Sequence, residues 1–192
     1  MIEDVLQAHP AAYAKIAKAT LESGFNMASD PLTCSLLRTL AASKPGGRFL
    51  ELGTGTGLAS SWILDGMDSA STLLSVDNDA AVLNIASACL GADERASFIL
   101  SDGADWISAN SERRFDYIFA DTWHGKYLML EEALTMLNCG GLYIIDDMLP
   151  QPNWPEGHAE KAILLVEILE QRDDLVLTKL NWATGIVIAV KK

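Results

Sequence analysis

Residues 49–57, which read FLELGTGTG, constrain the fold of this chain more than any other segment. The apolar run ends in Gly53, Gly55 and Gly57, a form typical of a buried strand that turns sharply into a helix. Because glycine has no Cβ, the backbone can adopt positive φ and approach a ligand closely, and the following helix offers free N–H donors. The segment therefore predicts a site for a nucleotide-like cofactor at this turn.

The spacing of these glycines disfavours a dinucleotide cofactor. A dinucleotide fingerprint places its third glycine three positions after the second, where this chain has Leu58. The acidic Glu51 would sit badly beside a pyrophosphate but suits a cationic sulfonium ligand that has no phosphates. The expected cofactor is therefore S-adenosyl-L-methionine (SAM), and an oxidoreductase is a distant alternative.

The same turn resembles the first motif of the class I SAM-dependent methyltransferases, E/D-x-G-x-G-x-G, through Glu51, Gly53, Gly55 and Gly57. The resemblance implies that these residues, together with Thr54, bind the cofactor. It also implies a transferase with the Rossmann-like fold of that class.

Alternation of apolar runs with amphipathic segments predicts an α/β fold with a doubly wound, seven-stranded, mostly parallel sheet. The expected strands lie near residues 48–52, 72–77, 96–100, 115–120, 141–146, 175–180 and 185–190. Residues 181–185 are too few for a crossover helix, so the last two strands should form a C-terminal antiparallel hairpin. One methyltransferase domain is expected over residues 1–192, with an N-terminal helical cap over residues 1–31.

Helix signals fall between these runs. Asp30 followed by Pro31 is typical of an N-cap and first helical position. Two apolar stripes are expected to be helical core: Tyr127, Leu130, Leu134 and Leu137, closed by Asn138 and Gly140, and Ala162, Leu165, Val166 and Leu169.

The composition of the chain limits the cellular location and the class of substrate that can be expected. With 49% hydrophobic and 21% charged residues the chain is globular, and no apolar run is long enough to span a bilayer. The acidic start, residues 1–4, lacks a signal peptide's basic region, so a cytoplasmic protein is expected. Fourteen Lys and Arg against 26 Asp and Glu give a net charge of −12, which disfavours nucleic acid and membrane surfaces and leaves a small-molecule acceptor. A homodimer is an open alternative that the sequence does not decide.

Two acids follow predicted strands on the cofactor side. Asp77 comes at the spacing from the glycine turn at which a carboxylate accepts hydrogen bonds from ribose hydroxyls. Asp102 lies in a segment that resembles the family's adenine-binding segment. For each acid the alternative is an N-cap of the next helix, which Asn78 or Asp79 could equally serve beside Asp77. The three cysteines, Cys34, Cys89 and Cys139, are expected to be buried free thiols.

Three more acids should converge at the carboxyl ends of neighbouring strands. Asp121 directly follows the run at residues 115–120, and Asp146 and Asp147 lie at the carboxyl end of the run at residues 141–146. Carboxylates this close favour a bound cation or a shared proton, and oxygen-only ligands suit Mg²⁺, Mn²⁺ or Ca²⁺. The alternative is that solvated acids cap loops.

At these positions the chain resembles the cation-dependent O-methyltransferases of the catechol and caffeoyl-CoA type, over about residues 28–150. The resemblance rests on Asp121-Thr122-Trp123, Tyr127, Leu130-Glu131-Glu132 and Asp146-Asp147. It implies a metal held by Asp121, Asp146 and Asp147. The chain departs from the pattern in having Asp147 where the family has asparagine, and His124 where the catechol enzyme has a lysine base.

The expected reaction is an in-line transfer of a methyl group from a cationic sulfur to a deprotonated hydroxyl. His124, Lys126 and Asp121 are the candidate catalytic residues, with His124 able to take a proton near neutral pH or only to contact the acceptor. Residues 150–158 form a proline-rich loop expected to bind the acceptor, with Trp123 and Trp154 able to stack on it and His158 expected to begin the next helix. Trp62, Trp106 and Trp182 are expected to pack inside.

Two other functions remain open. A metal-independent N- or O-methyltransferase would use Asp121 and Asp146 to orient the acceptor directly. A non-catalytic SAM-binding module would bind the cofactor without turnover.

Overall fold

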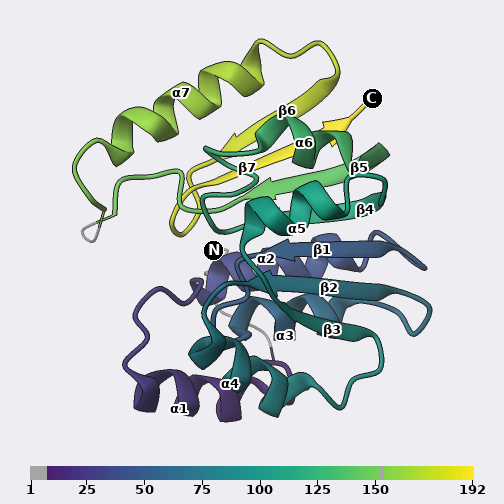
Figure 1. Ribbon diagram of the computed structural model, residues 1–192, viewed down its shortest axis with the longest axis vertical. Coiled ribbons are helices and arrows are strands. Elements are labelled where there is room, and N and C mark those ends of the chain that lie inside the picture. The colour runs from purple at the N-terminus through teal and green to yellow at the C-terminus, as the bar shows by residue number, and fades with distance from the viewer. Residues whose placement is uncertain (1–7, 152–153) are drawn as a thin grey trace, which may run out of the picture.

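A seven-stranded sheet forms the middle layer of the part of the chain that the computed structural model describes, residues 8–151 and 154–192 (Figure 1). The strands are β1 (Arg48–Leu52), β2 (Thr72–Asp77), β3 (Ala96–Leu100), β4 (Phe115–Ala120), β5 (Leu137–Ile145), β6 (Leu175–Leu180) and β7 (Ile186–Lys191). The strand order is β3-β2-β1-β4-β5-β7-β6, parallel from β3 to β5, with β7 antiparallel to both of its neighbours. The predicted doubly wound sheet with a C-terminal hairpin is confirmed.

Helices cover both faces of the sheet. They are α1 (Tyr13–Ser23), α2 (Pro31–Ala41), α3 (Leu58–Gly66), α4 (Ala80–Leu90), α5 (Gly103–Ala109), α6 (Leu130–Thr135) and α7 (His158–Glu170). One apolar core joins α1 to α4 to the sheet, and a second core joins α5, α6 and α7 to the opposite face. Among the described residues, no helix has the length and apolar character needed to cross a membrane.

The two cores follow from the two-residue period of the strands. Phe49 and Tyr117 point to the core of α1 to α4, whereas their neighbours Leu50 and Ile118 point to the core of α5 to α7. Since both faces are covered, these strands are apolar on both sides, as expected for parallel strands.

The strand order reverses direction at β1, which lies between β2 and β4. In open α/β sheets, ligands bind in the crevice at the carboxyl ends of strands at such a switch point. Leu52 pairs with Ala120, and Ala120 pairs with Ile145, so β1, β4 and β5 end at the same level. This register brings Gly53, Asp121 and Asp146 to one edge of the sheet.

The glycine turn depends on tight packing at two positions. Gly53 has φ of 98°, and a Cβ there would lie 2.6 Å from the carbonyl oxygen of Asp121. Gly57 has φ of 89°, and a Cβ there would lie 2.9 Å from the Cβ of Ala86 on α4. Both positions therefore require glycine for backbone conformation and for space.

Several local predictions are confirmed. Asp30 caps α2 by accepting from the N–H of Leu32 at 2.7 Å, and Pro31 is the first residue of the helix. The stripe on α7 is core, since Ala162, Leu165 and Leu169 are buried. Trp62 and Trp106 are buried, and Trp182 is half-buried and donates to the carbonyl of Leu32.

The first predicted helical stripe extends too far toward the C-terminus. Helix α6 ends at Thr135, and Leu137 already pairs with Phe115 in the sheet, so Asn138 and Gly140 lie within β5 and close no helix. Pairing with β4 overrides the helical pattern at Leu137, and after a shift of register it resumes at Leu142. Tyr127 lies in the turn before α6 and lines a cavity.

The cysteines are free, as predicted, but only one of them is buried. Cys34 lies in the core, Cys89 is half-buried and Cys139 is exposed on β5. The exposure of Cys139 follows from the same early start of β5, which places residues 138–140 beyond the end of the covered part of the sheet.

Candidate active site

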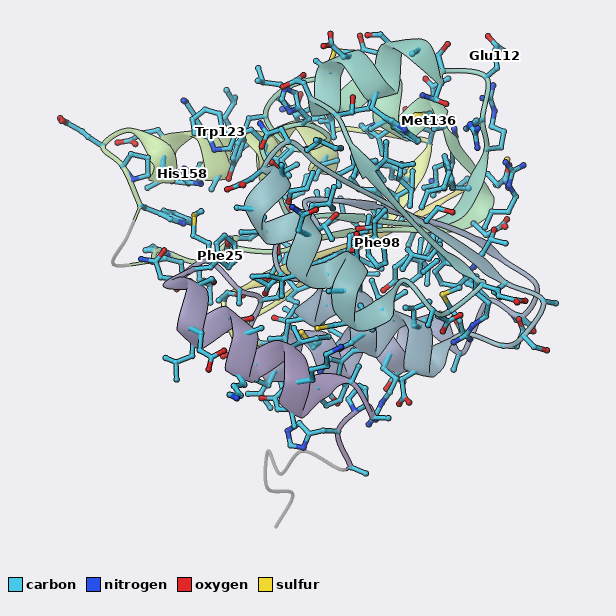
Figure 2. All side chains as sticks on the ribbon, turned by 60° about the horizontal axis from the view of Figure 1, so that its bottom comes forward. Phe25, Phe98, Glu112, Trp123, Met136 and His158 are labelled. Atoms are coloured by element: carbon cyan, nitrogen blue, oxygen red, sulfur yellow. The ribbon has the colours of Figure 1, made fainter. Side chains whose placement is uncertain are left out.

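A cavity of about 530 Å³ lies at the carboxyl ends of β1, β4 and β5. Its walls come from the glycine turn, the segment before α2, the turn after β4 and the loop before α7. Figure 2 shows Phe25, Trp123 and His158, which all line it, at one end of the molecule. The volume lies within the range of small-molecule sites.

One end of the cavity is built by the glycine turn and Asp77. Gly53, Thr54 and Gly55 line it, and the hydroxyl of Thr54 lies 2.6 Å from that of Ser75. The carboxylate of Asp77 accepts from the N–H of Gly55 at 2.8 Å through Oδ2, which fixes the turn to the end of β2. The shape of this wall therefore depends on the backbone of the turn and on one acid.

The N-cap of α4 is a different acid. Asp79 accepts from the N–H of Ala81 at 2.7 Å, whereas Asp77 accepts from the N–H of Asp79 through Oδ1. Since Asp79 serves the helix, the carboxylate of Asp77 is left at the wall of the cavity.

Glu51 does not lie where the sequence analysis expected it. Its side chain is fully buried beneath the turn, accepts hydrogen bonds from Ser60 and Ser75, and does not line the cavity. Burial raises the pKa of Glu51 to about 7, although both serines favour the charged form. Gly57 also lies off the cavity, where it packs against α4. These two residues support the turn from below.

Asp102 and His124 form a separate pair. Asp102 caps α5 by accepting from the N–H groups of Ala104 and Asp105. His124 Nε2 lies 3.9 Å from Asp102 Oδ1, and the ring borders a second cavity of about 30 Å³ with Asn78 and other residues. The structure therefore places His124 outside the lining of the large cavity.

Three carboxylates and one ammonium group line the middle of the large cavity: Asp121, Asp146, Asp147 and Lys126. Asp146 is only 1% exposed, and burial raises its pKa to about 6. Burial, followed by the charge of Asp146, also raises the pKa of Asp121. Lys126 is 4% exposed and donates from Nζ to the backbone oxygen of Asp146 at 2.7 Å, so a cation is fixed among the acids.

The arrangement of these carboxylates does not fit a divalent cation. Asp146 Oδ1 accepts from the Thr184 hydroxyl and from the N–H of Asp147, and Asp121 Oδ2 accepts from Ser29 at 2.9 Å. In residues 8–151 and 154–192, no three His, Cys, Asp or Glu side chains are grouped so that they could hold a metal ion. The acids share a cavity as predicted, but Ser29 and Thr184 donate to Asp121 and Asp146, and Lys126 lies beside them.

The sequence analysis missed part of the site. Phe25, Ser29 and Thr184 line the cavity but come from segments that were assigned to the cap and to the final hairpin. No local pattern marks them, and the hydrogen bonds of Ser29 to Asp121 and of Thr184 to Asp146 span 92 and 38 positions of the chain. Tyr127 and His158, assigned to helices, line the other end with Trp123 and Trp154.

This strand order defines the Rossmann-like fold of class I methyltransferases. A ligand-sized cavity lies between the glycine turn and the acids that follow β4 and β5. The chain belongs to the methyltransferase-domain family, whose model matches residues 50–148. A comparison with curated proteins gave no match.

Solved methyltransferase structures share the fold over nearly the whole chain. An O-methyltransferase from Bacillus cereus in complex with S-adenosylhomocysteine (SAH) is 18% identical, with a TM-score of 0.85, over 98% of this chain and 94% of that chain. The O-methyltransferase TomG from Streptomyces achromogenes, involved in tomaymycin synthesis and bound to SAM, is 20% identical, with a TM-score of 0.83, over 98% and 92%. An SAH-bound methyltransferase from Podospora anserina is 17% identical, with a TM-score of 0.82, over 97% and 90%.

Proposed function

We propose that this protein transfers a methyl group from SAM to a hydroxyl group of a small molecule, without the help of a metal ion. The observation that carries the proposal is the single cavity that runs from the glycine turn and Asp77 to Asp121, Lys126 and Asp146. SAM as the donor is supported by the structurally similar O-methyltransferases that bind SAM or SAH. The net charge of −12 disfavours nucleic acid as the acceptor.

In this proposal, the glycine turn and Asp77 bind the ribose of the cofactor. The Asp77 carboxylate is fixed by the N–H groups of Gly55 and Asp79, and its remaining lone pairs accept from the ribose hydroxyls. The sulfonium end of the cofactor then points toward Asp121.

Methyl transfer breaks the bond between the methyl carbon and sulfur and forms a bond between that carbon and the acceptor oxygen. Asp121 and Asp146 orient the acceptor hydroxyl, and one of these two carboxylates receives its single proton. Lys126 uses one N–H for the backbone of Asp146, so its other two N–H donors are available to the negative charge that develops on the oxygen. Because Lys126 is buried, this charge interaction is stronger than in water.

Calorimetric titration with SAH, followed by assay of SAH formation from SAM with a panel of hydroxyl compounds, tests the proposal. SAH should bind with and without EDTA, and turnover should persist in EDTA. Lys126→Met should lower kcat by about 100- to 1000-fold, the usual range for loss of one group that stabilises developing charge, while SAH still binds. Lys18→Met, an exposed lysine on α1, is the matched control.

A different experimental result would contradict each part of the proposal. Turnover that stops in EDTA and returns with Mg²⁺ would show a metal-assisted reaction. Binding of SAH without turnover of any acceptor would indicate a SAM-binding module. Absence of SAH binding would overturn the assignment of the cofactor.

A further inference from the structure

Each of the three carboxylates in the middle of the large cavity keeps an oxygen to which no described group donates. The clearest case is Asp146, whose Oδ1 accepts from Thr184 and from the N–H of Asp147, whereas its Oδ2 has no donor among the described residues. The residue is only 1% exposed, but this oxygen is not enclosed by protein and opens on the cavity that Asp146 lines. Asp121 uses Oδ2 for Ser29 and likewise leaves Oδ1 without a described donor. A carboxylate removed from water requires donors or a positive charge, so these oxygens indicate a ligand that supplies them.

Asp147 has the least support from the protein among these acids. In the described part of the chain its carboxylate accepts no hydrogen bond and forms no ion pair. It lies near the aromatic end of the cavity, because burial and then the charge of Asp147 raise the pKa of Tyr127 to about 12. Burial, followed by Lys126 and Lys161, lowers the pKa of His158. The imidazole is therefore neutral near pH 7 and does not offset the charge of Asp147.

Two of the three carboxylates have a positive charge beside them, but Asp147 has none. In the proposed function the sulfonium of SAM points toward Asp121, and Lys126 donates to the backbone oxygen of Asp146. Lys161 is exposed to water and does not line the cavity, so the solvent screens its charge. Because the carboxylates do not fit a divalent cation, the charge of Asp147 is left for an organic ligand of this cavity to complement.

We propose that the methyl acceptor carries a protonated amine in addition to its reacting hydroxyl, and that Asp147 binds this ammonium group. The inference rests on the proposed function, because it names the class of substrate for the same cavity. The carboxylate accepts N–H hydrogen bonds from the ammonium, and the aromatic rings at this end attract a cation through their faces. These rings belong to Trp123, Tyr127 and Trp154. The positive charge that the resemblance to cation-dependent enzymes assigns to a metal ion then comes from the substrate.

Acceptors of similar shape and different charge test this class. The pairs are 3-amino-1-propanol with 1-butanol, 5-amino-1-pentanol with 1-hexanol, and tyramine with 4-propylphenol. Each amine is a cation near pH 7, its partner has a methyl group in place of the ammonium, and the pairs differ in the distance from hydroxyl to charge. For at least one pair, kcat/KM of the amine should be about 10- to 100-fold higher, the range for a hydrogen bond to a charged group, mainly through KM. Equal kcat/KM values within every pair would overturn the inference.

Substitutions at Asp147 separate its charge from its shape. Asp147→Asn has nearly the same shape without the charge and should remove most of the preference for the amine. Asp147→Glu keeps the charge and should retain a preference. Glu160→Gln is the matched control, because it removes one negative charge from an exposed position on α7 outside the cavity, and it should match the wild type. Calorimetric titration with SAH checks that each variant is folded, and the comparison of pairs in the wild type does not depend on any variant.

Product analysis and added metal give two further readouts. The methyl group should be found on oxygen, because an ammonium nitrogen held by a carboxylate has no lone pair to attack carbon. Saturating Mg²⁺ should leave KM of the preferred amine unchanged. A methyl group on nitrogen would show that the amine is the nucleophile, and competition by Mg²⁺ would show that the carboxylates hold a metal ion. Either result would overturn the inference.

The outcomes distinguish this inference from the proposed function. An undiminished preference for the amine in Asp147→Asn would overturn the inference and leave the proposed function intact. A wild-type protein that binds SAH but methylates none of the amines would also overturn the inference. A wild-type protein that does not bind SAH would instead overturn the proposed function.

Discussion

The Ser29 hydroxyl donates a hydrogen bond of 2.9 Å to Oδ2 of Asp121 and so joins the segment before α2 to the carboxyl end of β4. Ser29 belongs to residues 25–30, which form one wall of the cavity. This hydrogen bond therefore connects the position of that wall to a carboxylate at the centre of the proposed site.

Loss of the Ser29 hydroxyl should weaken cofactor binding. We expect Ser29→Ala to lower SAH affinity by about 3- to 10-fold, because one hydrogen bond that orders the wall is lost. Calorimetric titration measures the change. Ser43→Ala, at an exposed position after α2, should leave the affinity unchanged, and an equal affinity for both variants would contradict the role of Ser29.

Asp77 and Asp79 offer a matched pair that separates cofactor binding from helix capping. Asp77→Asn should lower SAH affinity by about 10- to 100-fold, because hydrogen bonds to a charged carboxylate are lost. Asp79→Ala should lower the free energy of unfolding by about 1 kcal/mol through loss of the N-cap of α4, with little change in affinity. The reverse pattern would show that Asp77 only supports the turn.

Gly57 should not tolerate a side chain. Gly57→Ala should lower the free energy of unfolding by more than Gly24→Ala, since both residues have positive φ but only Gly57 would place a Cβ 2.9 Å from Ala86. The strain of positive φ alone costs on the order of 1–2 kcal/mol, and the contact with α4 adds to it. Urea denaturation of both variants gives the comparison. Equal losses would mean that α4 shifts to make room.

Buried Glu51 should make stability depend on pH. Its folded pKa of about 7 lies above the ordinary value of 4.5, so the folded state binds the proton more tightly than the unfolded state. The resulting stabilisation is fully present below pH 4.5 and is lost as the pH rises to about 7, by roughly 3 kcal/mol in total.

Glu51→Gln removes this pH-dependent contribution to the free energy of unfolding, because glutamine does not ionise. The free energy of unfolding of Glu51→Gln relative to the wild type should therefore rise between pH 5 and pH 8. Glu167→Gln, at an exposed position on α7, should show no such trend. Parallel pH profiles for Glu51→Gln and the wild type would contradict the raised pKa.

The local signals in the sequence predicted most of the fold. The bounds of β1 to β4 and β6 agree with the apolar runs, and Asp30-Pro31 begins α2 as expected. The prediction failed at residues 136–140, where the apolar spacing suits a helix but pairing with β4 decides the conformation. Within the site, Asp77 was found because it ends a strand, and Asp121 and Asp146 because they directly follow strands that end at the same edge.

The sequence by itself determined the class of this protein, because adjacent residues specify a glycine turn between a buried strand and a helix. Only the tertiary structure decided how the acids are used, since Ser29, Lys126 and Thr184 reach Asp121 and Asp146 across the sheet. The same holds for Glu51, which the strand pleat turns away from the cavity, and for His158, whose Nδ1 has no hydrogen-bond partner among the described residues. Burial and hydrogen-bond partners set the chemistry of such groups, and both arise from contacts between segments that are distant in sequence.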